Sequence, residues 1–587
     1  MSASESGCAH GKGGESPSSC AAGPAEHGPG YSGGIARTAA LLGGFALVSR
    51  VLGLLRDMSM AWLVGGGAAA DALVAAMRLP HVLRRMLGEG SLSMTLTASL
   101  VHLERMGASP GHAVEGERSR SMRLLARALA VRLGLVLTLL TVLGLVGTPW
   151  LTDILAPGFY GPERQEAIYL LRICLPYTLA AGMAALGMAL LHSLGVFWLP
   201  AVSPALFNIV ILCFAGAAAL GLLPAAPALA VGMLCGGIAQ WLAQWLAVRR
   251  LLPLHNAGPG DRPDAAQGSA GADESSLQRR AASLAWNCLG RLPAGLLGAS
   301  APQLAMLAAM SLASSMGRGQ VAALYYAERL LELPLGLVGV CLGMASLPTL
   351  SRLAAAREFS LFSDQLRTAL RLTLLLSLPA ATGLWAVGPR LVEGLLRHGA
   401  FGDNAAYETG LALWAYLPGL PAFAVNRSLL AACNALGEVR RTAVSAVWAV
   451  VATLAVGAAL VHSLSGSLGV MAPALAVSFG LWLQCGFLLS ILGRALKKSS
   501  AGAASASACL PSAGAVLRQC AAAAATALAA WQLLELLHGR GIWLGLALAI
   551  IGGATAWAVC LFVLRDADAL AAARALAHRL HGRPHQQ

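Results

Sequence analysis

Long apolar runs, each ended by a short polar or Gly/Pro-rich break, fill most of the chain from residue 36 onward. Runs of this length match the roughly 20 residues that a helix needs to cross the hydrocarbon core of a membrane. The pattern therefore predicts an all-α polytopic membrane protein with about 14 transmembrane helices. The predicted segments begin near residues 36, 71, 124, 166, 199, 225, 283, 321, 367, 406, 440, 466, 513 and 541.

The longest polar interruption divides the first twelve segments into six and six. It runs from Leu254 to Arg280 and is rich in Gly, Ala, Ser, Pro and Asp, a composition typical of a flexible linker. A charge before Leu-Pro occurs in the second and eighth segments, at Arg78 and Glu332, as a faint internal repeat of the kind found in secondary transporters. We expect a disordered tail 1–35, an N-lobe 36–252, a linker 253–281, a C-lobe 282–498, two accessory helices 499–566 and a second tail 567–587.

Composition supports the membrane interpretation. The 587 residues are 57% hydrophobic and only 12% charged, whereas soluble domains carry about 25% charged residues. The net charge of +14 would favour nucleic-acid binding in a soluble protein, but the basic residues here concentrate in loops between apolar segments. Because those loops lie on the side of both termini, the positive-inside rule predicts cytoplasmic N- and C-termini. The 12 cysteines show no metal-binding spacing, so we expect no metal.

Three of the predicted spans contain charged residues within apolar sequence. A charge at the bilayer centre costs about 2.5 to 3.5 kcal/mol, so such residues should face a water-filled cavity or one another. Asp71, Arg78 and Arg85 recur at seven-residue steps, which places them near one face of a helix. We predict a cationic cavity with interspersed carboxylates. The charges are Arg50, Arg56 and Asp57 in the first span, Asp71, Arg78, Arg84, Arg85 and Glu89 in the second, and Glu328, Arg329 and Glu332 in the eighth.

Simpler explanations exist for some of these charges. Arg84, Arg85 and Glu89 could lie near the end of a helix and reach the lipid headgroups. Asp71 could be a helix-start carboxylate favoured by the helix dipole instead of a gate residue.

Arginine in a cavity favours a phosphorylated substrate, because its guanidinium stays charged and donates two parallel hydrogen bonds to phosphate oxygens. A drug-cation exporter would more naturally have a carboxylate-dominated cavity. The sequence contains no P-loop, nucleophile elbow or HExxH motif, which argues against ATP-driven transport and against an enzyme.

Six stretches of the chain are distinctive. They are SRVLGLLRD (49–57), DALVAAMRLPHVLRRMLGEGSLS (71–93), APGF (156–159), LPAVSPALFN (199–208), YYAERLLELPLGLVGVCLG (325–343) and RHGAF (397–401). Together they closely resemble the MurJ/MviN family of bacterial lipid II flippases, within the multidrug/oligosaccharidyl-lipid/polysaccharide exporter superfamily. The resemblance runs from about residue 36 to residue 490 and extends more loosely through the last two spans.

The resemblance implies two six-helix lobes around a V-shaped central cavity, with two accessory helices that form a groove for a lipid tail. It implies transport of lipid II, undecaprenyl-pyrophosphate carrying a disaccharide-pentapeptide, from the inner to the outer leaflet of the cytoplasmic (inner) membrane for cell wall synthesis. By motif match, the substrate-binding residues would be Ser49, Arg50, Arg56, Arg84 and Arg329. The gating or ion-coupling residues would be Asp57, Asp71, Glu89 and Glu332.

We expect alternating access without a cofactor, driven by the membrane potential, with a coupled ion left open. The expected partners are lipid II, membrane lipid and cell-wall synthesis proteins, and not nucleic acid. One alternative is an exporter of another lipid-linked oligosaccharide or of a drug cation. Another is a scaffold that recruits cell-wall enzymes and transports nothing.

Overall fold

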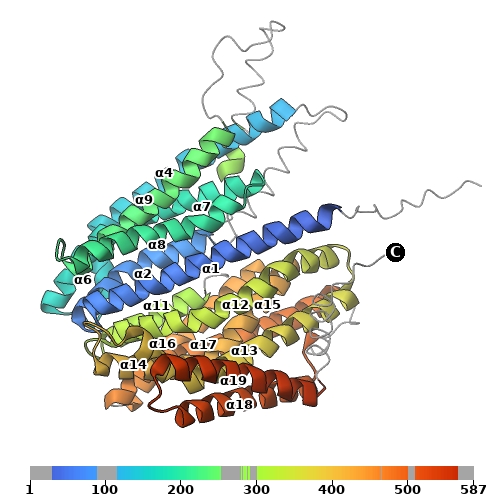
Figure 1. Cartoon of the computed structure of the whole chain (residues 1–587). Coiled ribbons are helices and arrows are strands. Elements are labelled where there is room, and N and C mark those ends of the chain that lie inside the picture. Colours follow the sequence, from blue (N-terminus) through green and yellow to red (C-terminus); the bar gives the residue numbers. More distant parts are fainter. Residues whose placement is uncertain are drawn as a thin grey trace, which may run out of the picture.

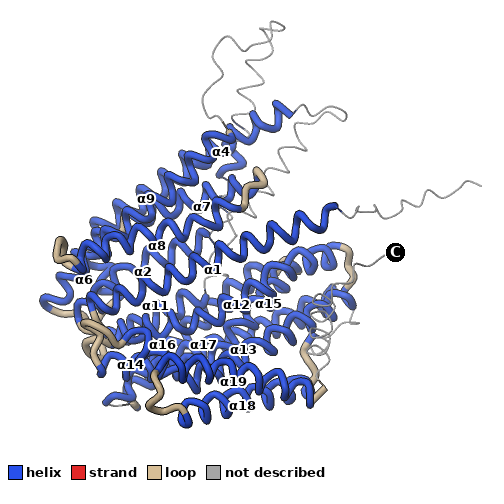
Figure 2. Tube along the Cα trace, viewed as in Figure 1, coloured by secondary structure: helices blue, strands red, loops and turns tan. Residues whose placement is uncertain are grey.

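The computed structural model describes residues 30–88, 115–252, 279, 282–286, 289–290, 301–464, 466–499 and 509–565. Within these residues the regular structure is helical throughout (Figure 2). The first group of helices is α1 (Gly30–Val64), α2 (Ala68–Gly88), α4 (Glu115–Val146), α5 (Thr148–Leu155), α6 (Gly161–Cys174), α7 (Tyr177–Ser193), α8 (Trp198–Ala219) and α9 (Ala225–Leu251). The second is α11 (Ala301–Ser314), α12 (Gln320–Ala355), α13 (Phe359–Leu396), α14 (Asp403–Tyr416), η1 (Leu417–Gly419), α15 (Leu420–Ala435), α16 (Val439–Ser463), η2 (Gly466–Val470), α17 (Met471–Ser499), α18 (Ala513–Leu536) and α19 (Ile542–Val563).

Apart from the seventh, much of which lies outside the described residues, the predicted apolar segments coincide with these helices. Nine helical stretches of the described residues are long and apolar enough to cross a membrane. α1, α2 and α12, which carry the charged residues that were predicted to face a cavity, are not among them. The tenth predicted segment is interrupted between α14 and α15 by η1, where Pro418 and Pro421 each lack a backbone N–H. The chain is therefore a multi-pass membrane protein, as its sequence predicts.

The outer helices present apolar side chains away from the protein. Leu139 on α4, Ile551 and Phe562 on α19 are 59%, 62% and 67% exposed. Exposure of such apolar side chains to water would cost free energy, whereas contact with lipid tails does not. The exposed apolar surface therefore marks the membrane-facing side of the helices.

The helices form two lobes. α1, α2 and α4–α9 pack together as the N-lobe, and α11–α17 pack together as the C-lobe. α18 and α19 pack against each other and against α13, on the side of the C-lobe that faces away from the N-lobe (Figure 1). Of the segment that follows the predicted linker, Ala285 is buried in an apolar cluster with α4, α7 and α9. The start of the predicted seventh span thus packs on the N-lobe.

The two lobes converge at one end of the molecule and diverge toward the other (Figure 1). At the closed end, Ala400 N donates to Trp62 O at 2.9 Å, and Gly158 N donates to Ser314 Oγ at 3.1 Å. The buried apolar core continues from one lobe into the other, for example from Ala61 to Ala322. α1 ends and α2 and α12 begin at this end, so the lobes are joined around the turns that connect these helices.

Candidate functional site

A cavity of about 480 Å³ lies between the two lobes. It is lined by parts of α1, α2 and α8 of the N-lobe and of α12 and α15 of the C-lobe. Its charged lining consists of six arginines and two carboxylates, an excess of four positive charges. These residues are Arg50, Arg56, Arg84, Arg85, Arg329 and Arg427, with Asp57 and Glu332.

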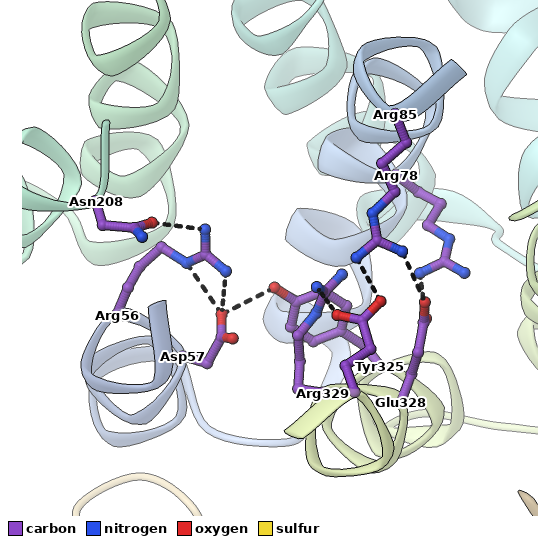
Figure 3. A network of polar contacts seen from close by, with 9 residues as sticks. Arg56, Asp57, Arg78, Arg85, Asn208, Tyr325, Glu328 and Arg329 are labelled. Carbon is purple, nitrogen blue, oxygen red and sulfur yellow. Dashed lines mark hydrogen bonds and ion pairs between the residues drawn. The ribbon is translucent and has the colours of Figure 1, made fainter. Parts of the chain in front are cut away.

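Arg56 is held by a network that joins three helices (Figure 3). Its Nε and Nη2 donate to Asp57 Oδ1 at 3.0 and 2.8 Å, and its Nη1 donates to Asn208 Oδ1 on α8 at 3.1 Å. Asn208 Nδ2 in turn donates to the backbone oxygen of Ser49 at 3.1 Å. Tyr325 on α12 donates its hydroxyl to Asp57 at 3.1 Å across the lobe interface. The direction of the Arg56 guanidinium is therefore fixed by both lobes.

α2 and α12 are joined by two ion pairs (Figure 3). Arg78 donates to Glu328, and Arg85, one step of seven residues later, donates to Glu332. The first pair is buried, with side-chain exposures of 7% and 3%, whereas the second is partly open to the cavity. Glu332 also accepts from Arg329 Nη1 at 2.7 Å. A dry ion pair thus lies beside one that an anion in the cavity can reach.

The remaining cavity arginines have no ion pair with a carboxylate among the described residues. Arg50 Nη2 donates to the backbone oxygen of Gly336 at 2.7 Å. Arg84 and Arg427 lie over aromatic rings, 5.9 Å from the centroid of Phe207 and 5.2 Å from that of Phe423. These three guanidinium groups keep most of their donors available, and they come from α1, α2 and α15.

Asp71 lies at the closed end and not in the cavity. Its side chain is fully buried and accepts backbone hydrogen bonds from Gly319 N and from Ala322 N, the latter at 2.7 Å. Gly319 is the N-cap residue of α12. Asp71 lies in the first turn of α2, where the helix-start explanation placed it. Its carboxylate nevertheless caps α12 of the opposite lobe, which was not predicted. A residue that joins the lobes in this way also fits the gate explanation.

The structure brings most of the predicted site residues together. The residues that line the cavity are Ser49, Arg50, Arg56, Arg84 and Arg329, with Asp57 and Glu332. Arg84 and Arg85 point into this cavity, so the explanation by lipid headgroups does not fit them. Glu89 lies outside the described residues. The seven-residue spacing of Asp71, Arg78 and Arg85 correctly predicted one face of α2, which lies against α12.

Several cavity residues were not predicted as site residues. Arg427 is a single cation within the apolar tenth segment, and that position alone could have marked it. Asn208 and Tyr325 carry no charge, and their roles depend on partners 152 and 268 residues away in the chain. Among the described side chains, no group of three or more His, Cys, Asp or Glu residues could hold a metal ion.

Known proteins share both the sequence and the fold of this chain. The sequence pattern of the family described as lipid II flippase MurJ matches residues 60–551. A protein of Haemophilus influenzae named probable lipid II flippase MurJ is 31% identical over 403 residues, which cover 65% of this chain and 72% of the relative. A protein of Burkholderia cenocepacia named lipid II flippase MurJ is 29% identical over 381 residues, or 64% and 69% of the two chains.

Solved structures agree at the level of the fold. A structure titled lipid II flippase MurJ, inward closed conformation, superposes with a TM-score of 0.66 at 18% identity and covers 90% of this chain and 100% of that one. An inward-facing multidrug resistance transporter of the MATE family gives a TM-score of 0.58 at 14% identity, covering 79% of this chain and 98% of its own. The arrangement of two lobes around a central cavity is therefore shared with transporters.

Proposed function

Because the chain belongs to the lipid II flippase MurJ family, we propose that it carries lipid II from the inner to the outer leaflet of the bacterial cytoplasmic membrane. The observation that carries this proposal is the cavity between the lobes, with its six arginines and two carboxylates. Lipid II combines a pyrophosphate with a sugar-peptide headgroup and a long apolar tail. The arginines of the cavity bind the pyrophosphate, and the apolar tail stays in the membrane.

Both termini lie in the cytoplasm in this proposal. The loops at the ends of α9, α12, α15 and α17 that lie on the side of the termini are basic, and short basic loops stay in the cytoplasm. The open end of the cavity then faces the cytoplasm, where lipid II is made available, and the closed end faces outward. The residues concerned are Arg249, Arg250, Arg352, Arg357, Arg440, Arg441, Lys497 and Lys498.

In this proposal, the substrate binds to arginines of both lobes, and movement of the lobes relative to each other transports it. Arg56 and Arg84 come from the N-lobe, and Arg329 and Arg427 come from the C-lobe. A pyrophosphate bound between them, with about two negative charges, neutralises about half of the excess positive charge and is contacted by both lobes. The lobes then rock so that the closed end opens and the headgroup leaves outward, while the tail stays in lipid. No covalent bond is made or broken.

The membrane potential is the proposed source of energy. A headgroup with about two negative charges that leaves an inside-negative cell gains about 4.6 kcal/mol at 100 mV, since each charge contributes about 2.3 kcal/mol. This gain is sufficient to concentrate lipid II in the outer leaflet without ATP.

The chemistry of the cavity separates this proposal from its rivals. An excess of four positive charges disfavours a drug cation as substrate. Another lipid-linked oligosaccharide would present the same pyrophosphate. Only a competition experiment between it and lipid II would show which of the two is the substrate. A scaffold for cell-wall synthesis proteins would not move the headgroup at all.

The test measures outer-leaflet lipid II in bacteria whose own flippase is switched off. The wild-type chain should restore it, and Arg50→Ala and Arg329→Ala should each lose it at equal membrane abundance, because each removes a phosphate-binding cation. Arg441→Ala is the matched control, since Arg441 is exposed outside the cavity and pairs with Glu438. Normal transport in both cavity variants would overturn the assignment of the cavity.

A further inference from the structure

Glu332 stands out among the carboxylates at the cavity because it joins arginines of both lobes. One carboxylate oxygen accepts from Arg85 Nη2 on α2, and the other accepts from Arg329 Nη1 on α12 at 2.7 Å. A pair of oxygens held by two guanidinium groups is also the arrangement that arginines offer to a phosphate. The lining of the cavity therefore includes an anion at the level where the cations from the two lobes meet.

Exposure distinguishes Glu332 from the other carboxylates nearby. Its side chain is 26% exposed and lines the cavity. Glu328, one turn earlier on the same helix, also pairs with an N-lobe arginine but is only 3% exposed and does not line the cavity. Asp57 lines the cavity but is 7% exposed and is held by Arg56 and Tyr325. Glu328 also lies 3.9 Å from Arg85, but its close partner is Arg78, whose side chain is only 7% exposed. An anion that enters the cavity can thus reach the two arginines bonded to Glu332 more easily than Arg78 or Arg56.

We propose that Glu332 holds, in the empty cavity, the place that the pyrophosphate of the substrate takes. The incoming pyrophosphate displaces the carboxylate from Arg85 and Arg329 and bridges the two lobes in its stead. When Glu332 returns to these arginines, it displaces the pyrophosphate and assists release. This inference rests on the proposed function and deepens it, because it makes Glu332 a residue of substrate exchange.

Such an internal competitor answers two physical needs of a cationic cavity. Arginines without a partner in a partly buried site are costly, and Glu332 satisfies two of them when the substrate is absent. Arginines that bind pyrophosphate without competition would also release it slowly, because differences in affinity appear mostly in the rate of dissociation. A tethered carboxylate lowers the affinity and returns the site to its empty state.

The first experiment titrates inorganic pyrophosphate into the full chain in lipid nanodiscs and measures binding by calorimetry. Glu332→Gln keeps the shape of the side chain but removes its charge, and it should bind pyrophosphate at least about tenfold more tightly, because hydrogen bonds to charged groups are worth that much. Glu328→Gln removes one negative charge nearby, at a residue that does not line the cavity, and should change the affinity less than about threefold.

The second arm asks whether the gain depends on the arginine that Glu332 covers. In the double variant Arg85→Gln/Glu332→Gln the tightening should disappear, and Arg85→Gln alone should weaken binding. Equal tightening in Glu332→Gln and Glu328→Gln would mean that only the net charge matters and would overturn the proposal. Unchanged or weaker binding by Glu332→Gln would overturn it as well. If Glu328→Gln fails to fold, Glu332→Asp supplies the comparison, because it keeps the charge and should bind pyrophosphate less tightly than Glu332→Gln.

Transport of lipid II in proteoliposomes gives the third readout. Glu332→Gln should lower both the half-saturating lipid II concentration and the maximal rate, whereas a merely structural loss would not improve saturation. If the wild-type chain flips lipid II but Glu332→Gln binds pyrophosphate like the wild type, the inference fails and the proposed function stands. If the chain does not flip lipid II but the pyrophosphate results hold, the proposed function fails and the cavity serves another pyrophosphate-linked substrate.

Discussion

At the scale of single residues, the cavity separates arginines that are fixed from arginines that are free to move. Arg56 is bonded to Asp57 and Asn208, and Tyr325 holds Asp57 from the opposite lobe. Arg427 is exposed and contacts only an aromatic face among the described residues. A fixed arginine presents its donors without reordering, and a free one can follow a large headgroup. Both kinds are useful in a site that must bind and then release its ligand.

Asn208→Leu should impair transport although it removes no charge. The change keeps the branched shape of the side chain but removes the acceptor for Arg56 Nη1 and the donor to Ser49 O. Loss of one charge-assisted hydrogen bond should lower the flipping rate roughly tenfold. The rate is measured in proteoliposomes of equal protein content. Asn404→Ala, an exposed site at the start of α14, should transport normally, and an unimpaired Asn208→Leu would show that Arg56 needs no support.

The charged residues of the cavity could be predicted from the sequence because an ionised side chain in an apolar span is conspicuous. Arg50, Arg56 and Arg329 were identified in this way, and all three line the cavity. Asn208 could not be identified, because an uncharged amide in a helix is common and its partner lies on another helix. A single sequence shows which side chains are costly in lipid, but not which distant residues satisfy them.

At the scale of helices, the start of α12 depends on a residue of the other lobe. The first N–H groups of a helix have no partner within it, and at α12 Asp71 accepts from two of them. The carboxylate also lies at the positive end of the helix dipole. Separation of the lobes at this end therefore uncovers both a helix terminus and a charge.

Asp71→Ala should weaken the closed end by about 1 to 2 kcal/mol, the usual cost of removing a helix cap. The measurement is hydrogen exchange at the backbone N–H of Ala400, which donates to Trp62 O across the closed end. Its exchange should become several-fold faster. In Asp71→Asn, which keeps one side-chain oxygen as acceptor, the increase should be smaller; equal exchange rates in all three chains would contradict this role of Asp71.

The number and order of the helices could be predicted, since membrane thickness sets the length of each apolar run. The face of α2 that meets α12 could also be predicted, from the seven-residue spacing of Asp71, Arg78 and Arg85. The break within the tenth segment at Pro418 was not predicted, because apolar side chains continue across it. Hydropathy reports the environment of a segment and not the path of its backbone.

At the scale of the whole molecule, the lobes are held at one end by close backbone contact. Gly158, in the APGF motif, lies directly against Ser314 of the other lobe, and a Cβ at this position would be 2.1 Å from the Ser314 backbone oxygen. Backbone atoms cannot move aside as a flexible side chain can. The closed end can therefore form only where this position lacks a side chain.

Gly158→Ala should shift the molecule toward the form that is open at this end. The added methyl group forces the lobes apart, so hydrogen exchange at the Ala400 N–H, which donates to Trp62 O, should become at least several-fold faster. Gly67→Ala is the matched control in the same region, because a Cβ there meets nothing within 4 Å. Unchanged exchange in Gly158→Ala would mean that the lobes close without this contact. The two-lobe architecture could be predicted from the sequence, but which end is closed could not, because both states satisfy the same hydropathy pattern.

α2 contacts α12 at three positions, Asp71, Arg78 and Arg85. The middle contact forms a pivot between the two lobes. Asp71 and Arg85 each lie seven residues, about 10.5 Å of helix, from Arg78, whose pair with Glu328 is the more buried of the two ion pairs between these helices. A seesaw motion about this pair moves the two outer levels by similar amounts in opposite senses. The contact at Asp71 would open as the lobes approach at Arg85. The Arg78–Glu328 pair would then stay intact through the whole transport cycle. The stretches of α2 from Arg78 to Asp71 and from Arg78 to Arg85, which are equal in length, would move in opposite directions.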